Sequence, residues 1–109
     1  MRDLARSVLQ SALDTYGFDA QLMMVIEESG ELIQAAAKFL GGREQSPKNL
    51  IGELADVSLM VDQMRLRWGP EISAARLIKL ERLEQRMNDM DTVSLPPLTA
   101  EQESLEAES

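Results

Sequence analysis

Apolar residues recur along most of the chain at the three- and four-residue spacing of amphipathic helices. Glycine and proline interrupt this pattern at Gly17, at Gly41-Gly42 and at Gly69-Pro70. The pattern therefore predicts an all-α fold with four helices. We expect these helices over residues 3–16, from about 19 to 40, over 47–68 and from about 70 to 89. Asp19 is expected to cap the second helix, and the third is expected to begin with Ser46 as N-cap and Pro47 in the first helical position.

The predicted connections are short, so consecutive helices are expected to pack antiparallel in a four-helix bundle-like protomer. About 89 ordered residues provide only a thin core. Sharing apolar helix faces would relieve this limit, and we expect a homodimer or homotetramer. The predicted organisation is one all-α domain over residues 1–89 and an acidic, flexible tail over residues 90–109.

The chain has 109 residues, without cysteine or histidine. The lack of cysteine excludes disulfides and zinc–thiolate sites, and the lack of histidine removes the commonest general base and transition-metal ligand. Any catalysis must therefore use carboxylates, hydroxyls, Lys, Arg or a bound ion. The formal net charge is −8, but five acids and no base follow residue 89, so eleven basic and fourteen acidic residues leave the remainder at −3.

This charge distribution contains no basic stripe that could follow a phosphate backbone, so nucleic-acid binding is not expected. The N-terminus lacks the apolar segment of a signal peptide, and no apolar run approaches the length of a membrane span. We therefore expect a cytoplasmic protein that does not bind membranes.

The second and third predicted helices each carry two acids three residues apart, Glu28 with Glu31 and Glu53 with Asp56. Residues at this spacing project from the same face of a helix. An unpartnered carboxylate is costly on an inward-facing stripe, so we expect a cation between the two helices. The apolar residues that share a side with Glu28 or Glu53 are Met24, Leu32, Ala35, Leu50, Val57, Met60 and Met64.

The identity of that cation has several alternatives. An interhelical salt-bridge cluster would need basic side chains, but Arg65 and Arg67 lie too far along the third helix and Lys38 could meet one acid at most. Di-iron bundles also use inward glutamate pairs but with a Glu-x-x-His motif, which a chain without histidine lacks; a di-iron carboxylate protein stays open as a rival that predicts a coloured, iron-loaded form. A hard divalent cation that takes oxygen ligands fits better, namely Mg²⁺ or, as a substitute, Mn²⁺.

The segments EESGEL (27–32) and GELAD (52–56) resemble the signature of the MazG-like all-α nucleoside triphosphate pyrophosphohydrolases. That signature is EExxE, a spacer of variable length, and ExxD, and here 21 residues separate Glu31 from Glu53. The flanking segments YGFDAQLMMVIEE and LIKLERLEQRM are similar to those of the compact phage- or cassette-type members. The resemblance covers residues 16–87.

The resemblance implies Mg²⁺-dependent hydrolysis of a (deoxy)nucleoside triphosphate to the monophosphate and pyrophosphate, as in house-cleaning of the nucleotide pool. It implies that Glu28, Glu31, Glu53 and Asp56 bind Mg²⁺. Glu27 would be a catalytic acid outside the ligand set, or the group that orients water. The preferred base and sugar stay open.

Weaker sequence signals concern the residues that could contact the phosphates and the base of the substrate. Lys38, Lys79 and Arg82 could hold phosphates, and the resemblance places basic residues near the last two; the alternative is a solvated helix face. Candidates for contact with the base are Gln21, Asn49 and Trp68, although such residues more often cap, pack or fill a core.

A function of another class is also open. A non-catalytic helical adaptor could use the acidic surface and tail to bind a partner protein. This alternative predicts that the inward acids tolerate amide replacement and have no affinity for ions.

Overall fold

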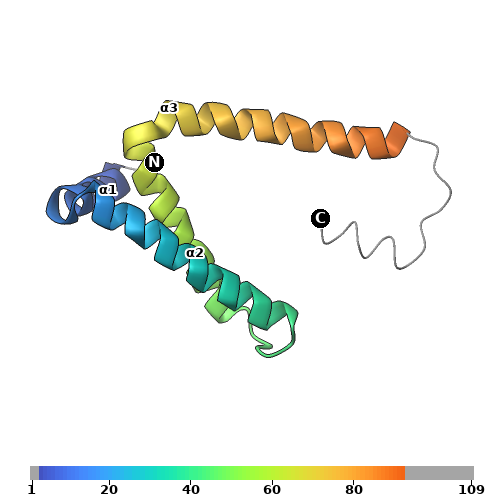
Figure 1. Cartoon of the computed structure of the whole chain (residues 1–109), viewed down its shortest axis with the longest axis horizontal. Helices are drawn as coiled ribbons and strands as arrows, with labels where there is room; N and C mark the ends of the chain where they lie inside the picture. Colours follow the sequence, from blue (N-terminus) through green and yellow to red (C-terminus); the bar gives the residue numbers. More distant parts are fainter. Residues whose placement is uncertain (1–2, 93–109) are drawn as a thin grey trace. The chain divides into compact units, whose positions relative to one another are not determined.

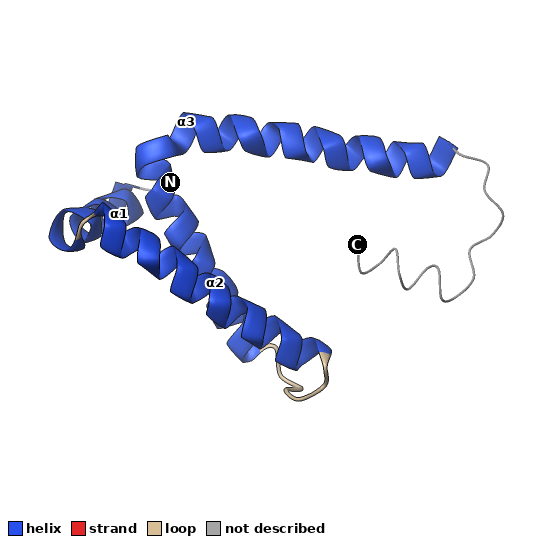
Figure 2. Cartoon of the chain, in the orientation of Figure 1, coloured by secondary structure: helices blue, strands red, loops and turns tan. Residues whose placement is uncertain are grey.

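The structure is a computed structural model that describes the backbone of residues 3–92 and the side chains of residues 3–90. This range is all-α, as predicted, and contains three helices: α1 Asp3–Tyr16, α2 Phe18–Leu40 and α3 Lys48–Thr92 (Figures 1 and 2). The third and fourth predicted helices correspond to the two helical stretches of α3, which meet at a kink at Trp68, while the predicted bundle and homo-oligomer stay predictions. The predicted tail lies outside the described residues from residue 93 onward.

The helix α3 is kinked where the sequence predicts a break. Trp68 has non-helical dihedral angles, with φ −124° and ψ 32°. Pro70, two residues further on, lacks an N–H and its ring disturbs the preceding turn. Arg65 bridges the kink, since its Nη1 donates a hydrogen bond to Ser73 Oγ at 3.1 Å. Because proline is tolerated in the first turn of a helical segment, Pro70 fits the start of the second helical stretch of α3.

The change of direction between α1 and α2 depends on Gly17. Its φ of 87° and ψ of 158° lie in a region that is essentially restricted to glycine. Gly17 occupies the N-cap position of α2, and no side chain caps this helix. The predicted capping role of Asp19 is therefore wrong, and Asp19 instead adds a negative charge to the first turn, where the helix dipole favours it.

The connection between α2 and α3 has the predicted end and start signals. Gly42 has a φ of 75°, its N–H donates to Phe39 O, and Arg43 N–H donates to Lys38 O, which together form a Schellman motif. At the start of α3, the backbone N–H of Lys48 donates to Ser46 Oγ at 3.3 Å, as expected for a serine N-cap.

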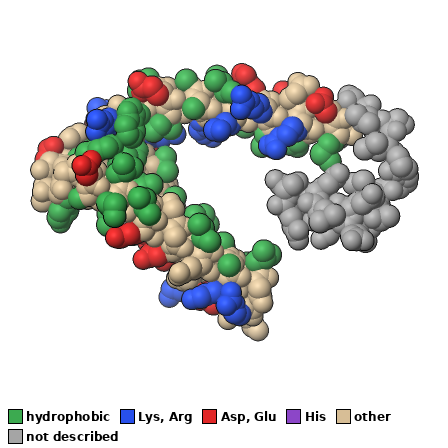
Figure 3. All heavy atoms as spheres, viewed as in Figure 1, with side chains coloured by type: hydrophobic (Ala, Val, Ile, Leu, Met, Phe, Trp, Pro, Cys, Tyr) green, Lys and Arg blue, Asp and Glu red, His purple; other side chains and the backbone are tan. Residues whose placement is uncertain are grey.

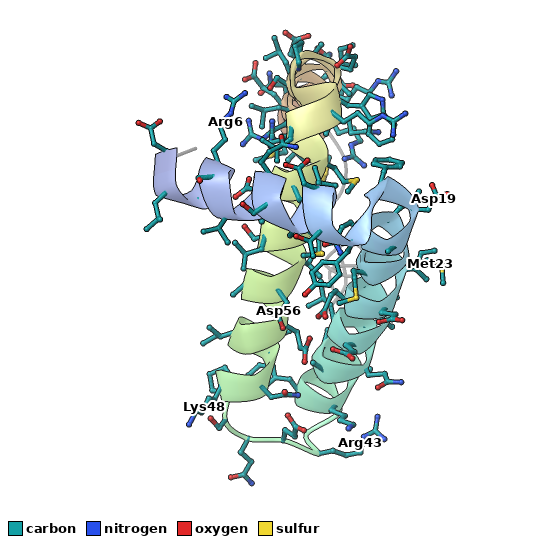
Figure 4. The ribbon with its side chains drawn as sticks, turned by 90° about the vertical axis from the view of Figure 1, so that its left-hand side faces the viewer. Arg6, Asp19, Met23, Arg43, Lys48 and Asp56 are labelled. Atoms are coloured by element: carbon teal, nitrogen blue, oxygen red, sulfur yellow. The ribbon has the colours of Figure 1, made fainter. Side chains whose placement is uncertain are left out.

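The contacts of the chain separate into two units, Met1–Ser73 and Ala74–Ser109. In the first unit α2 and the first part of α3 lie side by side, and α1 crosses them (Figures 1 and 4). Few side chains are fully buried there. Gln63, only 1% exposed, joins α1 to α3 because its Nε2 donates to Leu9 O at 3.2 Å. The buried residues are Leu9, Gln21, Ala35, Gln63 and Met64.

The apolar residues predicted to share a side with Glu28 and Glu53 are shielded from solvent in the first unit. Ala35 and Met64 are buried, and the other five apolar members are half-buried. The predicted helical periodicity therefore identifies the sides on which α2 and α3 face each other.

The described side chains of the second unit, residues 74–90, are all exposed. Among the helices that the structure describes, none combines the length and apolar character needed to cross a membrane.

Candidate metal centre

Three carboxylates from two helices converge between α2 and α3. Glu28 lies near the middle of α2, while Glu53 and Asp56 lie one turn apart on α3. One oxygen of each carboxylate can be chosen so that the three oxygens lie within 4.8 Å of one another. Figure 4 shows Asp56 on the side of α3 that faces α2. The predicted convergence of acids from the two helices is therefore present for these three residues.

Two of these carboxylates have oxygen atoms that are shielded from solvent without a partner. The Oε2 atoms of Glu28 and Glu53 are buried and accept no hydrogen bond. Desolvation raises the pKa of both carboxyls above the ordinary value of 4.5, and the neighbouring charges of Glu31 and Asp56 raise it further. The arrangement therefore opposes the ionised form that glutamate has at neutral pH.

The donor set fits a hard divalent cation. Carboxylate oxygens are the ligands that Mg²⁺ prefers, and the unpartnered Oε2 atoms are the kind of group that an ion would satisfy. In the part of the chain that the structure describes, no Lys or Arg forms an ion pair with Glu28, Glu53 or Asp56. The interhelical salt-bridge alternative therefore lacks its cation among these residues.

Glu31 and Glu27, the two remaining predicted acids, lie outside this group of three. Glu31 is exposed, yet its charge raises the pKa of Glu28 and Glu53, so it lies near both. Glu27 is also exposed. The predicted four-ligand set is thus represented by three converging carboxylates with Glu31 beside them.

A cavity of about 660 Å³ opens beside the carboxylates at the start of α3. It shares Glu53 and Asp56 with the cluster, and Gly52 leaves open space because no atom would contact a Cβ there. The cavity was not predicted from the sequence, although the polar run over residues 44–49, shortly before Glu53 and Asp56, is a usable signal. The remaining lining residues are Glu44, Gln45, Ser46, Lys48 and Asn49.

The basic residues proposed for phosphate binding occupy different parts of the chain. Lys38 is exposed in the last turn of α2. Lys79 and Arg82 belong to the second unit, where they line a surface hollow of about 600 Å³ together with Gln85 and Arg86. Their contact with phosphates stays a prediction.

The candidates for base recognition also differ in environment. Asn49 lines the cavity beside the carboxylates. Gln21 is buried at 8% exposure and borders a separate hollow near Tyr16. Trp68 packs edge-on against Phe18 with 5.3 Å between the ring centroids, and Arg67 lies over the Phe18 ring at 4.0 Å. Trp68 thus helps to pack the kink of α3.

Comparison with protein-family models, with curated proteins and with solved structures finds no match. The fold and the site define a small all-α protein with three helices in its described part and an acidic cluster between two of them.

Proposed function

We propose that the chain is a Mg²⁺-dependent nucleoside triphosphate pyrophosphohydrolase. The observation that supports this most directly is the convergence of Glu28, Glu53 and Asp56 within 4.8 Å, with two buried carboxylate oxygens that lack partners. The order and spacing of the acids, which resemble the MazG-like signature, support the choice of reaction.

In this proposal, Glu28, Glu53 and Asp56 hold the ion. When bound, Mg²⁺ supplies positive charge for a polyphosphate and activates water as a Lewis acid. The cavity next to Glu53 and Asp56 would then receive the substrate, with Asn49 and Lys48 on its wall. An acidic cluster alone would repel a triphosphate, so substrate binding should depend on the ion.

The reaction is the in-line attack of water on the α-phosphorus, which breaks the bond to the bridging oxygen and releases pyrophosphate. One proton must leave the attacking water. Glu31 is exposed and close to Glu28 and Glu53, and these properties support a role for its carboxylate as the proton acceptor. Glu27, on the same helix, is the alternative acceptor.

The test is pyrophosphate release from a panel of (deoxy)nucleoside triphosphates with Mg²⁺. We expect turnover by the natural chain and a loss of more than about 100-fold in Glu53→Gln and Asp56→Asn, since removing even an outer partner of a metal ligand costs up to that much. Glu71→Gln, which changes an exposed acid on the same helix, is the matched control and should keep full activity.

Calorimetric titration with Mg²⁺ separates the ion site from the reaction. We expect heat of binding for the natural chain and none for the Glu28→Gln/Glu53→Gln variant. Binding without turnover would retain the ion site and refute the hydrolase. Neither binding nor turnover would refute both and favour the adaptor alternative.

A further inference from the structure

Four basic side chains gather on one side of α3 in the second unit. At about 100° per residue, they lie within about 120° of the helix circumference. All four are exposed, and three of them line the surface hollow of about 600 Å³. Figure 3 shows Lys and Arg side chains along one edge of this part of α3. We call this set the basic face; it consists of Arg76, Lys79, Arg82 and Arg86.

The helix itself does not neutralise the basic face. Residues three and four positions apart are neighbours on a helix surface, and like charges at this spacing repel. Lys79 and Arg82 are three residues apart, and neither has an acid at these spacings, whereas Arg86 has Asp89. Among the residues that the structure describes, no ion pair includes a member of the basic face. Two further acids lie about 140–160° round the helix from Lys79, namely Glu81 and Glu84.

The basic face also contains a hydrophobic residue. Leu83 is 45% exposed, and it lies four residues after Lys79 and three before Arg86. These three side chains therefore follow one another along a line that is about 60° wide on the helix. This line is complementary to a helix that carries an acid, an apolar residue and an acid at the same spacing.

The chain contains such a segment outside the described residues. Glu101, Leu105 and Glu108 are separated by four and three residues, the same intervals as in the line on α3. Thr99 and Gln102 have the spacing of a capping box, which favours a helix that begins at residue 100. Residues 93–109 contain four glutamates and no basic residue. Their sequence therefore supplies both the charge and the spacing that the basic face requires.

The connection is long enough for this segment to fold back on α3. Arg86 lies six residues, or about 9 Å, before Thr92 along the helix, and the axes of packed helices lie about 8–10 Å apart. Residues 93–100 can span about 26 Å, which exceeds the distance to a position beside Arg86. A short connection of this kind joins antiparallel neighbours. The pairs that result are Arg86 with Glu101, Leu83 with Leu105 and Lys79 with Glu108.

The charge of the whole chain favours this segment over an external polyanion. A net charge of −8 repels nucleic acids and anionic membranes from the chain as a whole. A segment of the same chain instead carries its carboxylates at an effective concentration of about millimolar. The basic face is therefore better matched to the chain's own acids than to those of another molecule.

We propose that the basic face binds residues 100–108 of the same chain as a short antiparallel helix. This differs from the flexible tail that the composition predicts. It also gives Lys79 and Arg82 a ligand within the chain, with which a phosphate group would have to compete. The proposal concerns the second unit alone, so it is independent of the ion and of hydrolysis. Its tests need neither Mg²⁺ nor nucleotide.

Disulfide equilibria test the docking, because the natural chain has no cysteine. Docking brings the two thiols of Leu83→Cys/Leu105→Cys together. The matched control is Glu81→Cys/Leu105→Cys, in which the first thiol lies at almost the same level on the other side of α3. Leu83 and Glu81 are both exposed, so the fold should be retained.

In a glutathione buffer at low micromolar protein, we expect the intramolecular disulfide of the first variant to be favoured by at least about 10-fold over that of the control, because docking raises the effective concentration of the thiols. Equal equilibrium constants, or covalent dimers in place of the intramolecular product, would overturn the proposal.

Charge exchange in the Leu83→Cys/Leu105→Cys background tests the paired residues. Lys79→Glu should lower the disulfide equilibrium constant by about 5-fold, because an attractive pair becomes a repulsive one. Adding Glu108→Lys should restore it. Adding Glu103→Lys instead, which lies on the other side of the segment, should restore much less. No effect of Lys79→Glu, or equal recovery by the two lysines, would refute the pairing.

Discussion

At the scale of single residues, Glu28 and Glu53 are the residues whose environment conflicts most with their usual ionised state. Both are half-buried, and each has one carboxylate oxygen without a hydrogen-bond partner. A raised pKa in the folded state means that the folded protein binds protons more tightly than the unfolded chain. Without ions, their ionisation therefore opposes folding.

This conflict predicts an unusual pH dependence of stability. In the ion-free protein, the contribution of Glu28 and Glu53 should favour folding as the pH falls from neutral through their raised pKa values toward 4.5, and should be lost as the pH rises. Urea unfolding across this range, compared with Glu28→Gln/Glu53→Gln, isolates the two groups. A difference that does not change with pH would contradict the raised pKa values.

Added Mg²⁺ should reverse the sign of this effect. Protons compete with the ion for the same oxygens, so ion binding should stabilise the natural chain most at neutral pH and progressively less in acid. The measurement is the unfolding midpoint with Mg²⁺ and with chelator at each pH.

The periodicity of the sequence was sufficient to identify the inward positions but not the exact cluster. Spacing placed Glu28 beside Ala35 and Glu53 beside Met64, and both neighbours are buried. Spacing also grouped Glu31 with Glu28, yet Glu31 is exposed and lies outside the group of three. Which of two acids one turn apart reaches the opposite helix depends on how the helices approach each other, and a helical wheel does not contain that information.

At the scale of secondary-structure elements, the backbone at Gly17 sets the direction of α1 relative to α2. Its dihedral angles are strained for any residue with a Cβ, so Gly17→Ala should destabilise the fold by about 1–3 kcal/mol. Gly30→Ala is the matched control, because Gly30 is helical and a Cβ there would meet no atom. That change should stabilise α2 by up to about 1 kcal/mol. Urea unfolding of both variants measures the free energy of unfolding, which should fall in Gly17→Ala and rise in Gly30→Ala.

The attachment of α1 to α3 depends on a buried amide that is only half satisfied. Gln63 Nε2 donates to Leu9 O, but Gln63 Oε1 accepts no hydrogen bond. Gln63→Ala should destabilise the fold by about 2–3 kcal/mol, because it removes the bond and leaves a cavity. Gln63→Met keeps the volume and removes the unpartnered oxygen, so its cost should be below about 1 kcal/mol. Equal losses in chemical denaturation would mean that the hydrogen bond, and not packing, dominates.

The sequence correctly predicted those helix ends that depend only on neighbouring residues. Gly42 and Ser46 act as predicted because helix capping requires only a few neighbouring residues. The signal at Gly69-Pro70 also coincides with an observed interruption, because Trp68 has non-helical dihedral angles inside α3. Whether a proline ends a helix or bends it depends on the surrounding hydrogen bonds, such as that between Arg65 and Ser73.

At the scale of the whole molecule, the first unit buries few large side chains and leaves apolar faces exposed. Among the described residues of this unit, the buried hydrophobic ones are Leu9, Ala35 and Met64, while Ile26, Ile33 and others remain accessible. Burial of such residues is the main source of folding free energy. A chain with this core should therefore gain much of its stability from association.

Association makes stability depend on protein concentration. If the expected homodimer or homotetramer forms, each tenfold increase in concentration should raise the melting temperature by about 3–5 °C, and Ile33→Asp, which charges an exposed apolar position of α2, should weaken this dependence. Circular dichroism melts over a wide concentration range give the measurement. A melting temperature that is independent of concentration in the natural chain would count against the expected homo-oligomer.

The sequence by itself determined the helices, most of their ends and the sides of α2 and α3 that face inward, because these depend on interactions between residues a few positions apart. Only the tertiary structure decided that α1 is held to α3 through Gln63, and that Glu28, Glu53 and Asp56 are the acids that converge. Those outcomes depend on how whole helices approach one another, and that is set by packing and desolvation summed over many distant residues.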